Sequence, residues 1–333
     1  MKKITRILAV ILVAVMVFSF TACSNWVVKG GGETVPKGIY ALRMISAFYM
    51  AEVELDLEEA LTTKELLKKE IDGVSAEEWI KDFTLEAVKK YIAVEKEFKR
   101  LELKLSDNSI AYAKSMAASQ WKTYQFTYAK NGISLETLEN ANINSRKESV
   151  LFWELYGEGG EQEVTDSQIE DFFEENYFTI NEILLPKKDE DGKVYDEAKL
   201  QELRDKAQDY LERAATEDFD QLVAESMDEH IHEGETYEKM ISKEKSGYEE
   251  STINKLTAAK VGDVFMDEDD EYILVIKKCE TEDVDEIIEK NHDSLVTEMK
   301  TDEFGDYLLG VADEMDIKVN EKNFVAPSKM KLD

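Results

Sequence analysis

No proline lies between Pro36 and Pro186, and this gap limits the possible folds more than any other feature of the chain. Proline lacks an N–H and clashes with the preceding turn, so a long segment without it can form long helices. Apolar residues after Ser75 recur near helical spacing, and alternation typical of strands is scarce. We therefore expect an all-helical domain over residues 39–160. Its predicted helices cover residues 39–60, 75–105, 106–130 and 134–156.

Local signals mark where two of these helices begin and end. Ser75 is followed three residues later by Glu78, the spacing of a capping box in which two side chains bond the free N–H groups of a first turn. Asn131 and Gly132 together favour a helix end, because both residues tolerate the left-handed backbone of a C-terminal cap. We expect a helix to begin at Ser75 and another to end at Asn131.

After Gly160 the pattern changes to a mixture of strands and helices. Strands are predicted at 178–185, near 260–265 and at 271–276, with helices after Thr165, at 196–215 and at 218–225. We expect a small α+β domain over residues 164–281, and the fold class of the whole chain is therefore α+β. An amphipathic helix follows at 284–315, and a short strand at 316–319. The apolar stripe of this helix needs a surface to pack against, so residues 282–325 are predicted to pack on the helical domain.

The N-terminus has the arrangement of a secretory signal. Basic residues start the chain, an apolar run covers residues 7–20, and small residues precede Cys23. This order is typical of a signal peptide, and the run is shorter than the roughly 20 residues needed to cross a membrane. We interpret residues 1–22 as a lipoprotein signal peptide and Cys23, placed as in a lipobox, as the lipid attachment site. The glycine-containing segment 23–38 is predicted to be a flexible tether.

Composition excludes several classes of function. The chain has 73 acidic and 41 basic residues, a formal charge of −32, so its surface repels nucleic acid and anionic headgroups. The lipid, not charge, would hold it at a membrane. With Cys23 lipidated, Cys279 is the only remaining thiol and no internal disulfide is possible. Three histidines and two cysteines form no zinc motif, and no phosphate-binding loop is present, so we expect no cofactor.

Six segments after residue 160 have a characteristic order and spacing. They are Val164-Thr-Asp-Ser-Gln-Ile169, Ile180-Asn-Glu-Ile-Leu-Leu185, Phe219-Asp-Gln-Leu-Val-Ala-Glu225, Ala259-Lys-Val-Gly-Asp-Val264, Tyr272-Ile-Leu-Val-Ile-Lys277 and Ala312 to Phe324. Their order resembles the PrsA/SurA-type foldases, which are extracytoplasmic chaperones with parvulin-like (PpiC) prolyl isomerase domains. The lipid signal makes the PrsA branch the closer resemblance. The resemblance implies a chaperone domain over 39–160 and a parvulin-like domain over 164–281.

The same resemblance implies that the isomerase site is degenerate. The family uses two histidines and a Cys or Asp beside an apolar proline pocket, and such a pocket favours the twisted amide, which is less polar than the planar one. In this sequence Glu182 occupies the position of the family's first histidine, and Ile273, next to Tyr272, occupies that of the second. Asp228-Glu229 lies near the position of the family's Cys or Asp. An ionised Glu182 cannot replace a neutral imidazole. We expect weak or no catalysis, with Glu182, Asp228, Glu229 and Tyr272 as remnants of the site.

Four other groups have both a functional and a structural interpretation. His230 and His232 lack a third ligand at suitable spacing, so solvated loop residues are favoured over a metal site. The acidic run 267–271 lacks the glycine of a calcium loop, which favours a hairpin turn. Cys279 is interpreted as a packed residue. Four aromatic residues of one helix either pack a core or bind clients; they are Trp121, Tyr124, Phe126 and Tyr128.

We therefore predict a membrane-anchored extracytoplasmic chaperone or foldase for unfolded exported polypeptides, with no nucleic-acid partner. An active prolyl isomerase is the enzymatic alternative. A solute-binding lipoprotein is a further alternative, although it requires two α/β lobes that residues 39–157 do not predict. A purely structural envelope protein is the weakest of these interpretations.

Overall fold

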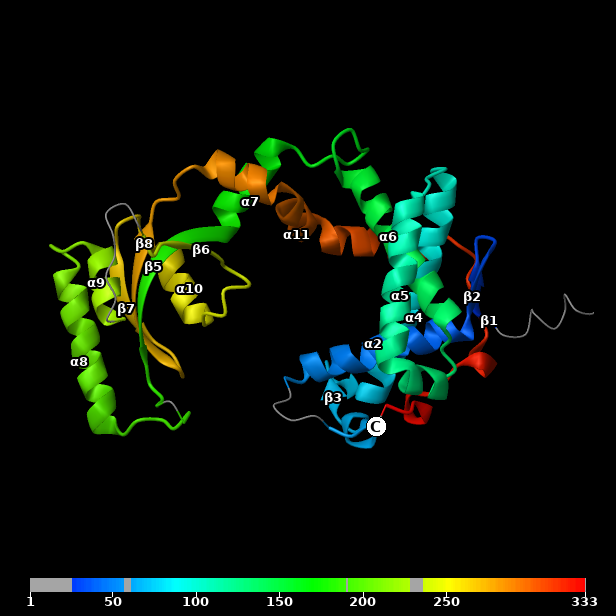
Figure 1. Ribbon diagram of the computed structural model, residues 1–333, viewed down its shortest axis with the longest axis horizontal. Coiled ribbons are helices and arrows are strands. Elements are labelled where there is room, and N and C mark those ends of the chain that lie inside the picture. The colour runs from blue at the N-terminus through cyan, green and yellow to red at the C-terminus, as the bar shows by residue number, and fades with distance from the viewer. Residues whose placement is uncertain (1–25, 57–60, 190, 228–235, 333) are drawn as a thin grey trace, which may run out of the picture. The chain divides into compact units, whose positions relative to one another are not determined.

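The computed structural model describes residues 26–56, 61–189, 191–227 and 236–332. These form two compact units, which we call unit 1 (Met1–Glu163 with Lys300–Asp333) and unit 2 (Val164–Met299). Most of their helices and strands are labelled in Figure 1. The predicted α+β class is confirmed, because unit 1 is mainly helical and unit 2 is built on an antiparallel sheet. Within the described ranges, no helix combines the length and apolar character needed to cross a membrane.

Unit 1 is built mainly on helices. Four are long, namely α2 (Lys37–Glu54), α4 (Ala76–Arg100), α5 (Asp107–Lys130) and α6 (Leu135–Tyr156), and α3 (Thr63–Leu66) is a single turn. The predicted helix starts agree with the observed caps, since the Ser75 and Ser106 side chains accept hydrogen bonds from the N–H groups of Glu78 and Ser109. The domain is not wholly helical, however, because strands β3 (Glu70–Ile71) and β4 (Val74–Ser75) form a small hairpin between α3 and α4.

The prediction of a flexible tether over 23–38 is wrong from Trp26 onward. Strands β1 (Trp26–Gly30) and β2 (Glu33–Pro36) form a hairpin, and the Val27, Val28 and Val35 side chains are buried. Gly31 and Gly32 have φ of 56° and 87°, a left-handed backbone that glycine adopts without steric cost. The glycine run therefore makes a turn within a sheet, because valines on both sides of it are buried in unit 1.

The C-terminal residues belong to the same unit. Strand β9 (Lys318–Val319) pairs with β1 and gives the sheet order β2-β1-β9. Beyond it, η2 (Glu321–Asn323) precedes Phe324, whose ring stacks on Tyr40 at 4.7 Å between centroids, and η3 (Pro327–Lys329) follows. The end of the chain thus contributes directly to the core built by its first helices.

Helix α11 (Val284–Asp313) is shared between the two units, which divide between residues 299 and 300. The predicted boundary at 282 is therefore too early. Part of the reason is a bond within unit 2, where the Tyr177 hydroxyl donates to the Glu298 carboxylate at 2.9 Å. The later part of α11 belongs to unit 1, and its Phe304, Leu308 and Ala312 are buried.

Unit 2 is organised around a four-stranded antiparallel sheet of order β6-β5-β8-β7. The strands are β5 (Tyr177–Pro186), β6 (Lys239–Ser242), β7 (Val264–Glu268) and β8 (Tyr272–Cys279), and the helices are α7 (Asp166–Asn176), α8 (Glu197–Arg213), α9 (Phe219–Ser226) and α10 (Glu250–Ala258). Strand β6 and helix α10 are absent from the sequence prediction, since their segment is polar and gives no clear periodicity.

The two faces of this sheet are covered by different helices, as Figure 1 shows. Ile183 and Ile273 belong to a buried cluster with residues of α8 and α9. Ile180 and Leu274 belong to a second cluster with Leu256 of α10. Because side chains alternate along a strand, residues at even positions of β5 and β8 lie on the α10 face.

Candidate functional site

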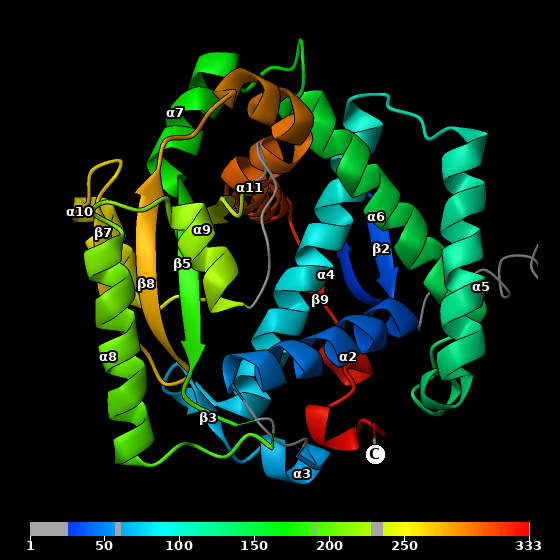
Figure 2. The same ribbon diagram turned by 60° about the vertical axis from the view of Figure 1, so that its left-hand side comes forward.

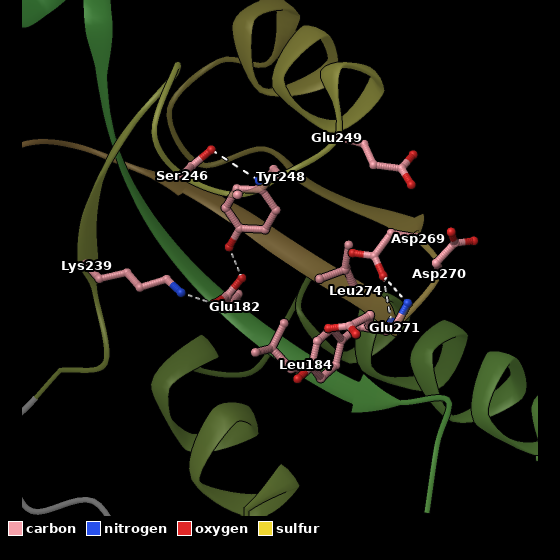
Figure 3. A pocket seen from close by; sticks show the side chains of 12 residues that line it. Glu182, Leu184, Lys239, Ser246, Tyr248, Glu249, Asp269, Asp270, Glu271 and Leu274 are labelled. Atoms are coloured by element: carbon pink, nitrogen blue, oxygen red, sulfur yellow. Dashed lines mark hydrogen bonds and ion pairs between the residues drawn. The ribbon is translucent and has the colours of Figure 1, made fainter. Parts of the chain in front are cut away.

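A pocket of about 390 Å³ lies on the α10 face of the unit 2 sheet. The β5–β8 register pairs Leu184 with Leu274 and Pro186 with Tyr272, which places Leu184, Leu274 and Tyr272 in the pocket lining. Glu182 lies further along β5 on the same face. The remaining lining residues are Lys239, Ser246, Gly247, Tyr248, Glu249, Asp269, Asp270 and Glu271. Figure 3 shows these side chains around the strands. The pocket therefore combines an apolar floor with an acidic rim.

Glu182 is held by two donors within this pocket. Its side chain is only 8% exposed, and its carboxylate accepts hydrogen bonds from the Tyr248 hydroxyl and the Lys239 ammonium (Figure 3). Burial and the neighbouring Glu182 raise the pKa of Tyr248 far above its ordinary value, so the phenol remains a donor. These two partners satisfy the buried carboxylate, as a buried charge requires.

The positions of the family's isomerase residues do not converge here. Ile273 is fully buried in the cluster on the α8 and α9 side, so it faces away from Glu182 and the pocket. Tyr272 does line the pocket. Asp228 and Glu229 lie outside the described residues, as do His230 and His232. In the part of unit 2 that is described, the donors at Glu182 are a phenol and an ammonium, not an imidazole.

The acidic run 267–271, which covers the end of β7 and the turn to β8, has a structural role. Asp267 accepts hydrogen bonds from Lys255 at 2.7 Å and from Thr252 at 2.8 Å, which attaches α10 to the sheet. Asp269 accepts from the backbone N–H groups of Glu271 and Tyr272, each at 2.7 Å, and so closes the hairpin turn. These carboxylates are therefore already bonded within the fold.

The four aromatic residues of α5 divide into two pairs. Trp121 and Tyr128 stack at 6.4 Å between centroids and pack against a cluster that includes Ala117 of α5 and Leu138 of α6. Tyr124 and Phe126 are 56% and 77% exposed. Tyr124 has φ −118° and ψ 17°, a non-helical backbone that kinks α5 at this residue. Trp121 and Tyr128 are thus partly buried against the core, whereas Tyr124 and Phe126 are available to a partner.

Two further apolar residues of α5 are exposed, and the sequence analysis missed them. Tyr112 and Met116 are 52% and 40% exposed and lie four residues apart, so they are neighbours on one side of the helix. We call the exposed side chains of Tyr112, Met116, Tyr124 and Phe126 the α5 surface. Figure 2 shows α5 beside α6, and only Ala113 and Ala117 of α5 are fully buried. The sequence did contain a signal for these exposed residues, because apolar residues occur all around this helix. A single neighbouring helix covers only one side of it, so some of those apolar side chains must be exposed.

The two cysteines lie in different settings. Cys23 is outside the described residues. Cys279 is buried at the end of β8, and burial, followed by the neighbouring Glu238, raises the pKa of its thiol to about 12. A thiol with this pKa carries almost no thiolate near neutral pH, so Cys279 has the character of a packing residue.

The fold and this pocket define an α+β protein with a mainly helical unit and a second unit built on a four-stranded sheet. No protein-family model matches the sequence, and no curated protein matches it. Among solved structures, the chain is similar to the foldase PrsA of Streptococcus pneumoniae, with 21% identity, a TM-score of 0.38 and coverage of 72% of this chain and 86% of that one.

Two other solved structures have similar coverage. The PrsA foldase of Lactococcus lactis has 13% identity and a TM-score of 0.36, covering 92% of this chain and 100% of that one. A SurA-like chaperone of Campylobacter jejuni has 11% identity and a TM-score of 0.29, covering 89% and 100%. These are the kinds of protein that the sequence resembles.

Proposed function

We propose that this protein is an extracytoplasmic chaperone that binds apolar segments of unfolded exported polypeptides on the α5 surface. The observation that carries this proposal is the exposure of Phe126 and Tyr124 on a helix whose buried residues are the small Ala113 and Ala117. Large apolar side chains in water do little for the stability of a fold, and an exposed group of them is typical of a binding surface. Tyr112 and Met116 extend the group along the helix.

The chemistry of the α5 surface suits a client of variable sequence. Tyrosine offers a large flat contact together with a hydroxyl, and methionine adapts its shape to different partners. Only four exposed apolar side chains contribute, so each client would be held weakly and released easily. Such transient binding delays aggregation while leaving the client able to fold.

The location at the membrane is also part of the proposal. The signal at residues 1–22 and the lipobox-like Cys23 support export and lipid attachment at the outer surface of the cell membrane. Metabolic labelling of the expressed chain with a radioactive fatty acid tests this part. Label is expected in the natural chain and absent from a Cys23→Ala variant, and label in both chains would contradict lipid attachment at Cys23.

Unit 2 is proposed to be a structural arm or a weak binding site with little or no isomerase activity. Support comes from Glu182, whose carboxylate is already bonded to Tyr248 and Lys239, and from Ile273, which faces the opposite side of the sheet. The pocket with its Leu184 and Leu274 floor favours the alternative of an active prolyl isomerase. A proline-peptide assay separates the two functions, because a kcat/KM well above background that falls on Tyr272→Ala would establish isomerase activity.

The further alternative of a solute-binding protein requires two α/β lobes, and the described residues contain a single four-stranded sheet.

Aggregation of a urea-unfolded secreted protein, followed by light scattering, tests the chaperone proposal. The natural chain is expected to suppress scattering at an equimolar ratio, and the combined variant Tyr112→Ser, Met116→Ser, Phe126→Ser is expected to lose most of this effect. Because these side chains are exposed, each substitution should change the free energy of unfolding by no more than ~0.5 kcal/mol relative to the natural chain.

A matched control uses three exposed apolar side chains of unit 2. Val194, Met227 and Val261 are each about half exposed, and their combined change to serine is expected to leave suppression intact. Equal loss in both variants would show that general surface polarity, not the α5 surface, is responsible. No suppression by the natural chain would end the chaperone proposal.

A further inference from the structure

We infer that the α5 surface prefers apolar client segments that carry acidic side chains. This inference rests on the proposed function and names the class of segment that the same surface binds. It starts from the charge distribution along the chain, which is strongly uneven. From Asn108 to Leu135 there is no aspartate or glutamate, although the whole chain contains 73 acidic residues in 333. The acid-free stretch begins just inside α5 and ends just after it.

The basic residues in this stretch are available for pairing. Lys114, Lys122 and Lys130 are all exposed, and among the described residues none of their ammonium groups has an ion-pair partner. Many other lysines are paired, for example Lys147 with Glu95 at 2.5 Å and Lys187 with Glu268 at 3.0 Å. The α5 surface is therefore bordered by cations that have no carboxylate within the acid-free stretch 108–135 to neutralise them.

A fourth cation lies against the surface itself. The Arg146 guanidinium of α6 stands 4.3 Å from the centre of the Tyr112 ring. This contact holds a positive charge beside an exposed apolar side chain, at the junction of α5 and α6. A docked segment would meet aromatic rings and positive charge together.

Screening by dissolved salt determines which charges of the protein act on a docked segment. At physiological ionic strength the Debye length is about 8 Å, so the lysines of α5 act on the segment more strongly than carboxylates that lie farther away than this length. The acidic remainder of the chain still attracts basic segments to other places on the molecule. The local field therefore favours an acidic segment at α5, against the trend of the net charge.

An anionic membrane is the other partner with this charge, and the surface fits it less well. Helices that lie in a membrane interface have one continuous apolar face and a strongly charged opposite face. Here Ser119, Thr123 and Gln125 lie among the apolar residues, and the kink at Tyr124 interrupts the helix. Hydroxyl and amide groups between aromatic rings suit the alternating polar backbone and apolar side chains of a polypeptide.

Binding of fluorescent peptides to the full mature chain tests the inference. The peptides share one Leu/Phe core and are flanked by glutamates, serines or lysines. The glutamate-flanked peptide is expected to bind about three- to tenfold tighter than the lysine-flanked one, as exposed charge pairs allow, and the ratio should fall towards one in 1 M salt. A variant with Lys114→Glu, Lys122→Glu and Lys130→Glu should reverse the order.

The control variant carries Lys64→Glu, Lys193→Glu and Lys260→Glu, which changes the net charge equally with exposed lysines elsewhere. It should keep the preference for glutamate flanks. Equal binding of the three peptides would overturn this inference and leave the proposed function standing, whereas no binding of any peptide would overturn both. Lysine-dependent binding to phosphatidylglycerol vesicles without peptide preference would assign the surface to the membrane instead.

Discussion

The Tyr307 hydroxyl donates a hydrogen bond to Oε2 of Glu97 at 2.6 Å, and this bond joins two residues that are 210 positions apart in the chain. Glu97 belongs to α4 and is only 3% exposed. The Arg100 guanidinium also donates to both oxygens of this carboxylate, at 2.6 to 3.0 Å. A buried charge in α4 is thus satisfied partly by the C-terminal helix. This explains why the late segment of the sequence completes unit 1.

Tyr307→Phe is expected to lower the free energy of unfolding by about 1.5–3 kcal/mol, because the buried Glu97 carboxylate loses a charge-assisted hydrogen bond. Urea unfolding monitored by circular dichroism measures the change. Tyr49→Phe is the control, since that tyrosine is exposed and its loss of a hydroxyl should change stability by less than ~0.5 kcal/mol. Equal stability of the two variants would show that the bond to Glu97 does not hold α11 to unit 1.

Phe304→Ala is expected to destabilise unit 1 by about 3–4 kcal/mol through the cavity that it leaves. The Phe304 ring is buried and meets the rings of Phe152 and Tyr156 edge-on, at 5.4 and 6.2 Å between centroids. Hydrogen exchange measured by mass spectrometry should show faster exchange in residues 300–313 before any change in the sheet of unit 2. Unchanged exchange there would contradict the packing of this helix segment.

The stability that Glu268 contributes to unit 2 should depend on pH. Hydrogen bonds from Arg204, and then from Lys187, outweigh the effect of burial and lower the pKa of this carboxyl from 4.5 to about 2. A lowered folded-state pKa means that the contribution is complete above the unfolded value near 4.5 and is lost as the pH falls towards 2.

Glu268→Gln should therefore cost about 1–2 kcal/mol at pH 7, after allowance for the partial exposure of the side chain, and much less at pH 3. Urea unfolding of both chains at the two pH values measures this difference. Glu212→Gln, an exposed glutamate of α8, serves as the control and should show no such dependence. A cost that stays constant with pH would show that the loss is due to packing rather than charge.

Cys279 is expected to react slowly with iodoacetamide in the native chain at pH 8. Its thiol is buried and has a raised pKa of about 12, so little thiolate forms and little reagent reaches it. In urea the rate should rise by at least about tenfold, because the unfolded thiol has a pKa near 8.5. The Cys23→Ala chain isolates this reaction. Rapid labelling of the folded chain would contradict the burial of Cys279.

Local structure followed from the sequence alone in many places. The helices that begin after Ser75, Ser106 and Thr165 were predictable, because their caps and apolar periodicity involve residues only a few positions apart. Strands β5 and β8 were predictable for the same reason, since their apolar runs and the turn residues around them are local signals. The α+β class followed from the order of these segments.

Only the tertiary structure decided what depends on contacts between distant segments. Residues 26–36, predicted to be a tether, form β1 and β2 instead, because β9 from far along the chain pairs with β1 and the valines of the hairpin are buried in unit 1. Strand register placed Ile273 on the opposite face from Glu182, and the one-sided packing of α5 separated the partly buried Trp121 from the exposed Phe126. Burial and pairing depend on which surfaces meet in space, and residue spacing along one segment does not contain that information.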